Sequence, residues 1–336
     1  MMKTIFFACG GTGGHVFPAV AVAEAIRNLD SSLGIVFVGR AAPSMEERLL
    51  SSKYDYRQIK AVPLARNSII KNLFLPFSLL SCVLGAAKLL KNEKPEFIVG
   101  TGGYVALPIM LAAILKRIPF YIIEPNAVMG VANKICAKFA KKNYIASPVR
   151  EMPQNLPPPE AFADSSKFRI LITGGSQGAL GINRKIEQIR DKISANENLS
   201  IVWQVGAKNL TQYSGAKNIC VTAFLDNIYA YMQHADLIIS RSGASTLAEI
   251  LAFGKAAVFL PFPYATANHQ EHNARAIEKE GAAFVELDRE ENALWEKITD
   301  LMNNKEKLES MSKKARELGE LNRRAAGKIA EDICST

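Results

Sequence analysis

The sequence predicts an α/β protein made of two doubly wound domains, each with a parallel sheet. The length of 336 residues suits about two domains, and 49% of the residues are apolar, enough for two cores. Short apolar runs, typical of buried parallel strands, alternate with stretches of helical spacing. Glycine-rich turns join strand to helix at residues 10–14, 100–103 and 174–178. This order predicts ligand sites at the carboxyl ends of the strands.

In the first half, the strand predicted at residues 3–8 enters the turn GGTGGH. Helical spacing follows over residues 16–29, with Pro18 in the first turn. The same order recurs up to residue 146. We expect further strands at 35–38, 97–99, 120–123 and 144–146, and helices at 79–90, after Tyr104 up to 116, and at 129–139.

The second half repeats this pattern after a segment at 147–166 that contains five prolines and little periodicity. We therefore predict domains at 1–147 and 167–336 with a linker at 148–166, and we expect the last helix to pack back on the first domain. The predicted strands are 169–172, 201–205, 219–221, 237–239, 256–260 and 283–286, and the predicted helices are 183 onward, 229–234, 246–253, 271–280 and 323–333.

The cysteine pattern argues against a disulfide framework and against a zinc site. Five cysteines are scattered along the chain without a C-x-x-C pair. Neither a D-x-D motif nor a His/Cys/Asp cluster is present, so we expect no metal and no cofactor. The first apolar run is too short for a signal peptide, and a reducing cytosolic compartment is expected.

Positive charge is concentrated in the first half of the chain. The net charge is +9, and residues 1–150 contain 19 Lys and Arg against 8 Asp and Glu. These basic residues are dispersed and lack interleaved aromatic residues, which argues against nucleic acid and leaves an anionic membrane surface as the favoured partner. The apolar segment 69–77, with Arg66 and Lys71, is predicted to lie on that surface, although core packing would also explain it. Lys71 and Pro76 argue against a spanning helix.

The stretch SRSGASTLAEI at residues 240–250 predicts a diphosphate site. It follows a buried strand, and the amides of Ala244, Ser245 and Thr246 would lie at a helix N-terminus, where the dipole favours an anion. Glu249 is close enough to bond sugar hydroxyls. A solvated helix-face carboxylate is the alternative interpretation of Glu249.

His15 directly follows the first glycine turn, where a strand ends. It is a candidate general base because imidazole titrates near neutral pH. The alternative is a histidine that only bonds the backbone and shapes the loop. The turn is not the dinucleotide motif, since Val16 stands where the third glycine would be and no acidic residue follows the next strand.

Five motifs occur along the chain in the order GGTGGHVFPA, GTGGY, GGSQGA, SRSGASTLAEI and N-HQ-x-x-NA. In these motifs, and nearly end to end, the chain resembles the MurG family of peptidoglycan glycosyltransferases. The resemblance implies a GT-B fold, with two Rossmann-like domains facing a cleft. It also implies inverting transfer of N-acetylglucosamine (GlcNAc) from UDP-GlcNAc to the C4 hydroxyl of N-acetylmuramic acid (MurNAc) in lipid I, which gives lipid II. The enzyme would be peripheral, on the cytoplasmic face of the inner membrane, with other cell-wall synthesis proteins as expected partners.

The resemblance also assigns site residues. His15, the candidate base, and Tyr104 fall in loops that would face lipid I, and Gln270 would bond the GlcNAc hydroxyls. The expected donor residues are Thr12, Gly13, Gly14, Asn126, Arg150, Ser176, Gln177, Leu225 (through its backbone, to uracil), Ala244, Ser245, Thr246, Leu247, Ala248, Glu249 (to ribose) and Gln270. One departure is Pro125, which stands where family members often have glutamine and removes a backbone donor.

Three other functions remain compatible with these motifs. The first is another GT-B glycolipid synthase, and the second is a UDP-GlcNAc epimerase, which would need no membrane-facing apolar patch. The third is a non-catalytic nucleotide-sugar-binding scaffold at the membrane. Turnover that depends on a lipid I analogue would separate the proposed transferase from all three.

Overall fold

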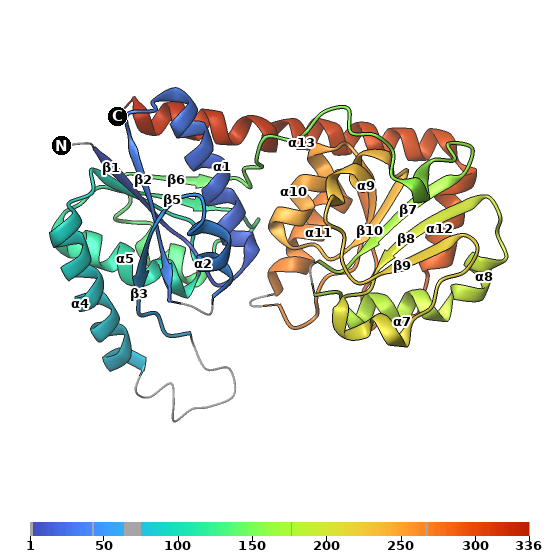
Figure 1. Cartoon of the computed structure of the whole chain (residues 1–336), viewed down its shortest axis with the longest axis horizontal. Coiled ribbons are helices and arrows are strands. Elements are labelled where there is room, and N and C mark those ends of the chain that lie inside the picture. Colours follow the sequence, from blue (N-terminus) through green and yellow to red (C-terminus); the bar gives the residue numbers. More distant parts are fainter. Residues whose placement is uncertain (1–2, 42–43, 64–74, 176, 266–267, 336) are drawn as a thin grey trace. The chain divides into compact units, whose positions relative to one another are not determined.

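The computed structural model describes residues 3–41, 44–63, 75–175, 177–265 and 268–335. The chain divides into two compact units, Met1–Arg150 with Arg323–Thr336 (unit 1) and Glu151–Asn322 (unit 2) (Figure 1). Each unit contains a six-stranded sheet whose strands pair in parallel, with helices packed on it. The predicted class, two doubly wound α/β domains, is confirmed.

Unit 1 is built on a sheet with the strand order β3-β2-β1-β4-β5-β6. Its strands are β1 (Thr4–Ala8), β2 (Gly34–Arg40), β3 (Asp55–Ile59), β4 (Phe97–Gly100), β5 (Phe120–Glu124) and β6 (Lys142–Ile145). Its helices are α1 (Gly13–Leu29), α2 (Met45–Leu50), α4 (Leu75–Glu93), α5 (Gly103–Lys116) and α6 (Val131–Cys136). In register, Ile5 of β1 pairs with Ile35 and with Phe97.

Both faces of this sheet are buried, which explains the unbroken apolar run of β1. Ile5 and Phe7 face a core formed with α1, whereas Phe6 and Ala8 face a core formed with α4 and α5. The first core also includes the last turns of α13 (Lys305–Cys334), through Ala326, Ile329, Ala330 and Ile333. Lys142 and Tyr144 on β6 both donate to Oδ2 of Asp332 in these turns. The C-terminus is therefore part of unit 1.

Unit 2 repeats the plan with the strand order β12-β11-β10-β7-β8-β9. Its strands are β7 (Phe168–Thr173), β8 (Leu199–Gln204), β9 (Ile219–Thr222), β10 (Leu237–Ser240), β11 (Ala256–Phe259) and β12 (Ala283–Val285). Its helices are α7 (Leu180–Gln188), α8 (Arg190–Ser194), α9 (Ile228–His234), α10 (Ala244–Ala252), α11 (His269–Lys279), α12 (Leu294–Asn303) and the first part of α13, with short 3-10 helices at Glu160–Phe162 and Ala207–Gln212.

The proline-rich segment after Arg150 packs on unit 2. Phe162 is buried in its core, and the carbonyl of Leu156 lies 2.7 Å from Nε2 of His234. A buried ionic cluster lies directly after β12 in unit 2. Glu286 accepts hydrogen bonds from Lys185 of α7 and Lys297 of α12. This cluster ties two helices to the end of β12.

Several boundaries differ from those predicted. Helix α1 begins at Gly13 and α10 at Ala244, earlier than the predicted residues 16 and 246. The residues before the predicted starts, Gly13 to His15 in α1 and Ala244 and Ser245 in α10, include no large apolar side chain, so they add little to the apolar spacing that marks a helix in sequence. Strand β3 and helix α2 were not predicted. The half-exposed edge strand Asp55–Ile59 lacks the apolar run that marks a buried strand.

Candidate active site

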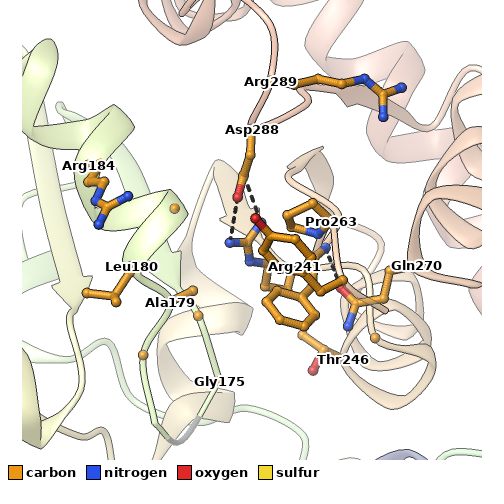
Figure 2. Close-up of a pocket in the computed structure, with 16 residues that line it drawn as sticks. Gly175, Ala179, Leu180, Arg184, Arg241, Thr246, Pro263, Gln270, Asp288 and Arg289 are labelled. Atoms are coloured by element: carbon orange, nitrogen blue, oxygen red, sulfur yellow. Dashed lines mark hydrogen bonds and ion pairs between the residues drawn. The ribbon is translucent and has the colours of Figure 1, made fainter. Parts of the chain in front are cut away.

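A cavity of about 790 Å³ lies in unit 2 beyond the carboxyl ends of β7, β10, β11 and β12 (Figure 2). This is the edge at which ligands bind in open parallel sheets. Its walls come from the third glycine turn, the first turns of α7 and α10, and the segments after β11 and β12. The lining residues are Gly174, Gly175, Gly178, Ala179, Leu180, Gly181, Arg184, Arg241, Gly243, Thr246, Phe262, Pro263, Tyr264, Gln270, Asp288 and Arg289.

The third glycine turn is fixed by side chains of the sheet beneath it. The hydroxyl of Thr173 accepts from the amide of Gly175 at 3.2 Å, and Gln204 donates to the carbonyl of Gly175 at 2.9 Å. Gly178 has φ +71°, and a Cβ there would lie 1.9 Å from the carbonyl oxygen of Val205. Only glycine fits this position. Gln177 is exposed on the same turn, and Ser176 lies outside the described residues.

Arg241 is a site residue that was not predicted from the sequence. Its guanidinium bonds both carboxylate oxygens of Asp288, at 2.9 and 3.1 Å (Figure 2). It also donates to the carbonyls of Leu260 and Pro261, both at 2.9 Å. These bonds fasten the segment before α10 to the ends of β11 and β12. Bidentate pairing is specific to arginine, so Arg241 positions the first turn of α10.

Gln270 lines the cavity and presents its side-chain NH₂ group there. Its Oε1 accepts from the amide of Phe262 at 3.0 Å, and a Cβ built on Gly243 would lie 3.9 Å from its Nε2. Ser242 also donates to the Gln270 carbonyl at 2.8 Å. With Oε1 engaged, the amide group offers N–H donors beside the N-terminus of α10, as a sugar hydroxyl or phosphate oxygen requires.

Glu249 has a defined partner, so it is more than a solvated helix-face carboxylate. The hydroxyl of Tyr229 donates to its Oε1 at 2.7 Å. The side chains of Leu225, Leu247 and Ala248 are buried in the core of unit 2. Any ligand contact of these three residues is therefore expected from the backbone.

In unit 1, His15 is oriented by the second glycine turn. Its Nδ1 lies 2.7 Å from the carbonyl oxygen of Thr101, and the Thr101 hydroxyl donates to the His15 carbonyl at 2.8 Å. A carbonyl oxygen only accepts, so Nδ1 carries the proton and Nε2 holds the lone pair in the neutral ring. One contact thus shapes the loop and also sets the tautomer that a base needs.

The first two glycine turns touch each other. Gly103 has φ +78°, and a Cβ there would lie 3.0 Å from the Gly10 carbonyl oxygen and 3.2 Å from Cδ2 of His15. The ring of Tyr104 packs in the same way on Gly11, where a Cβ would lie 3.1 Å from Cε1. The structure therefore brings the two predicted acceptor residues, His15 and Tyr104, into one cluster.

The remaining predicted residues of unit 1 lie at or beside the start of α1. Thr12 is its N-cap, and the Thr12 carbonyl accepts from the amide of His15 at 3.1 Å. Gly13 and Gly14 form the first turn. The guanidinium carbon of Arg150 lies 4.8 Å from the ring centroid of Phe17 in the same helix.

A buried carboxylate, missed in the sequence, holds the loop that contains Asn126. Glu124 accepts from the Asn126 backbone at 3.0 Å, from the Asn126 side chain at 2.8 Å, and from the Gly130 amide and the Asn133 side chain, both at 2.9 Å. None of these donors comes from residue 125. The missing amide of Pro125 therefore leaves this network complete.

Comparison with known proteins agrees with this architecture. The N-terminal domain of glycosyltransferase family 28 matches residues 5–145, and the C-terminal domain of that family matches residues 169–332. The UDP-N-acetylglucosamine–N-acetylmuramyl-(pentapeptide) pyrophosphoryl-undecaprenol N-acetylglucosamine transferase of Carboxydothermus hydrogenoformans is 36% identical, over 94% of this chain and 92% of its own.

Two solved structures are also similar. Acinetobacter baumannii MurG is 30% identical, with a TM-score of 0.80 over 99% of this chain and 100% of its own. A putative UDP-N-acetylglucosamine 2-epimerase from Listeria monocytogenes superimposes with a TM-score of 0.70 over 99% of this chain and 96% of its own, but at 14% identity it shares the fold alone.

Two parallel-sheet units, with glycine turns at the carboxyl ends of their strands and a cavity beside a helix N-terminus, form a GT-B fold, and the two family 28 domains make the chain a glycosyltransferase. The chain belongs to glycosyltransferase family 28 and, within it, to the MurG family of N-acetylglucosamine transferases.

Proposed function

We propose that the chain transfers GlcNAc from UDP-GlcNAc to the C4 hydroxyl of MurNAc in lipid I, giving lipid II with inversion at the anomeric carbon. The observation that carries this proposal is the geometry of His15, whose Nδ1 is engaged by the Thr101 carbonyl so that Nε2 is the basic nitrogen. Relatives across more than nine-tenths of the chain carry names that describe this transfer.

The donor is assigned to the unit 2 cavity. Its diphosphate would lie against the first turn of α10 and the third glycine turn, where backbone amides and the helix dipole stabilise an anion. Gln270 would donate to the GlcNAc hydroxyls, and Glu249 would accept from the ribose hydroxyls. The backbone amides and the helix dipole favour departure of UDP because negative charge grows on its β-phosphate as the sugar leaves.

The acceptor is assigned to the cluster formed by His15, Tyr104 and the first two glycine turns. The C4 oxygen attacks the anomeric carbon of GlcNAc while the bond from that carbon to the β-phosphate oxygen of UDP breaks. Nε2 of His15 takes the proton of the C4 hydroxyl. Attack from the face opposite the leaving group converts the α-linked donor to a β-1,4 product.

The test of this proposal is UDP release by the purified protein, given UDP-GlcNAc with and without a short-chain lipid I analogue. We expect UDP only when the analogue is present, together with a β-1,4-linked disaccharide product. UDP release with a diacylglycerol acceptor would instead identify a glycolipid synthase. Conversion of UDP-GlcNAc without any acceptor would indicate an epimerase, and donor binding without turnover would indicate a scaffold.

Replacement of Glu249 tests the donor assignment. We expect Glu249→Ala to raise the Kd for UDP-GlcNAc by about tenfold or more, because hydrogen bonds to a charged group contribute roughly 1.5–3 kcal/mol. Tyr229→Phe should have a smaller effect, since it removes only the bond that orients the carboxylate. Isothermal titration with UDP-GlcNAc and with UDP checks this. The ribose is common to both ligands, so a loss confined to UDP-GlcNAc would contradict the ribose assignment.

We infer that unit 1 binds an anionic membrane surface. No helix in the described part of the chain has both the length and the apolar character needed to cross a bilayer. Most of the predicted segment 69–77, with Arg66 and Lys71, lies outside the described residues. The start of α4, however, exposes Phe77 (72%), Leu80 and Leu84, and Lys88 follows on the same face at helical spacing. Exposed apolar side chains with basic neighbours suit an anionic interface.

Leu84→Asp should release the protein from vesicles that contain anionic lipid. The substitution puts a negative charge into the apolar face, whereas the position is 60% exposed and contributes little to folding. Leu321→Asp on α13 is a matched control, because Leu321 is 66% exposed in unit 2. Vesicle sedimentation measures binding, and circular dichroism checks the fold. Equal retention of both folded variants would rule out α4 as the contact.

A further inference from the structure

Helix α2 places a carboxylate inside unit 1. Glu46 is 0% exposed, and its Oε1 lies 3.2 Å from Nε of Arg40. No residue in the described part of the chain donates a hydrogen bond to the buried Oε2. The side chain also reaches the first glycine turn, since a Cβ on Gly10 would lie 2.8 Å from Oε1. The cost of burying the Glu46 carboxylate offsets much of what its ion pair with Arg40 adds to stability, which points to a role in holding Arg40.

Arg40 is held by its main chain and by its side chain. It ends β2, and its carbonyl accepts from the Tyr56 hydroxyl at 2.8 Å and from the Ser44 hydroxyl at 3.2 Å. Its guanidinium carbon lies 5.6 Å from the centroid of the Tyr104 ring, within the range of a cation–π contact. A planar guanidinium can bond a carboxylate through its edge and stack on an aromatic ring through its face.

Tyr104 connects this pair to the acceptor cluster. Its ring packs against the Arg40 guanidinium and the backbone of Gly11. The charges of the pair also reach the phenol: burial raises its pKa, Arg40 lowers it, and Glu46 raises it. Loss of the guanidinium would remove the cation–π contact and leave the packing on Gly11.

We propose that Arg40, held by Glu46, is a positioning residue that orients the Tyr104 ring for binding of the acceptor. This inference rests on the proposed function, in which Tyr104 faces lipid I. It implies that Arg40 governs the affinity for the acceptor rather than the affinity for the donor, because Arg40 contacts Tyr104 and is not among the residues that line the unit 2 cavity.

The first experiment compares three substitutions in the full-length protein. We expect Arg40→Ala to raise the KM for a short-chain lipid I analogue about tenfold, the effect of a lost contact of moderate strength. The Kd for UDP-GlcNAc should stay within about twofold. Arg40→Lys keeps the positive charge but lacks the planar guanidinium, so its KM for the analogue should be closer to that of Arg40→Ala than to that of wild type. The matched control is Arg57→Ala: Arg57 is 37% exposed, as Arg40 is, and pairs with Glu93 at 2.8 Å, but should change neither constant.

A double-mutant cycle then asks whether Arg40 acts through Tyr104. In a Tyr104→Phe background, which keeps the ring, Arg40→Ala should still cost about tenfold in KM. In a Tyr104→Leu background it should cost less than about twofold, because the partner of the contact is gone. A tenfold cost that persists in Tyr104→Leu would show that Arg40 acts on the acceptor or on the fold directly, and would overturn the proposal.

A second variant separates positioning from folding. Arg40→Ala leaves Glu46 as an unpaired buried carboxylate, so Arg40→Ala/Glu46→Gln removes both charges. A folded double variant with a raised KM supports the proposal, and a normal KM overturns it. If wild type converts the analogue but Tyr104→Leu leaves KM unchanged, the inference fails while the proposed function stands. If wild type does not convert the analogue, the proposed function itself fails.

Discussion

His15→Ala should lower kcat by about 10²–10⁴-fold and leave the Kd for UDP-GlcNAc within about twofold. Proton transfer by a positioned base contributes rate enhancements of this size, equivalent to roughly 3–5 kcal/mol of activation free energy. The donor constant should not change because the role proposed for His15 is proton transfer at the acceptor, and His15 is not among the residues that line the unit 2 cavity. Steady-state UDP release with a lipid I analogue and isothermal titration with UDP-GlcNAc measure the two quantities.

His15→Asn is the matched control, because its side-chain amide can donate to the Thr101 carbonyl as Nδ1 does, yet cannot accept a proton at neutral pH. If His15 is the base, His15→Asn should be as slow as His15→Ala. If His15 only shapes the loop, His15→Asn should recover most of the activity. Recovery would therefore rule out the general base and keep the structural role.

Glu286→Gln should lower the free energy of unfolding by about 3–5 kcal/mol, the usual effect of breaking a buried ion pair. Glu286 is 1% exposed, and its loss leaves the buried ammonium of Lys185 without a carboxylate. Both tryptophans, Trp203 and Trp295, lie in unit 2, so urea unfolding followed by tryptophan fluorescence reports on this unit. Glu197→Gln is the control: its pair with Lys217 is exposed and should contribute about 0–1 kcal/mol.

The same carboxylate predicts a pH dependence. Burial alone raises the pKa of Glu286, but the hydrogen bonds from Lys185 and Lys297 outweigh burial, so the pKa is lower than in a free glutamate. Such a group adds stability above its unfolded pKa of about 4.3, and this contribution is lost as the pH falls through the folded pKa. Below about pH 5, unfolding midpoints should therefore fall more steeply for wild type than for Glu286→Gln. If the unfolding midpoints of the two proteins fall in parallel with pH, Glu286 is not the group responsible.

The sequence predicted both sheets because parallel strands buried on two faces appear as apolar runs, as in β1 and β10. It also located the glycine turns, because close approach of backbone demands glycine, as at Gly178. These local signals do not depend on distant partners. For this reason the fold class and the positions of the glycine turns were predictable from the sequence.

The residues that were missed depend on partners far away in the chain. Glu124, Glu46 and Arg241 resemble surface charges in sequence, yet each is held by the fold. Arg241 reaches Asp288, which no local pattern connects to it. The orientation of His15 is similar: its position was predictable, but its tautomer follows from Thr101.

Because unit 1 is completed by Arg323–Thr336, its gene segment is split by the whole of unit 2. On the ribosome, β1 to β6 emerge first, but the core on one face of their sheet lacks Ala326, Ile329, Ala330 and Ile333 until that later segment has been made. A truncation that removes residues 326–333 therefore harms the unit that was translated first.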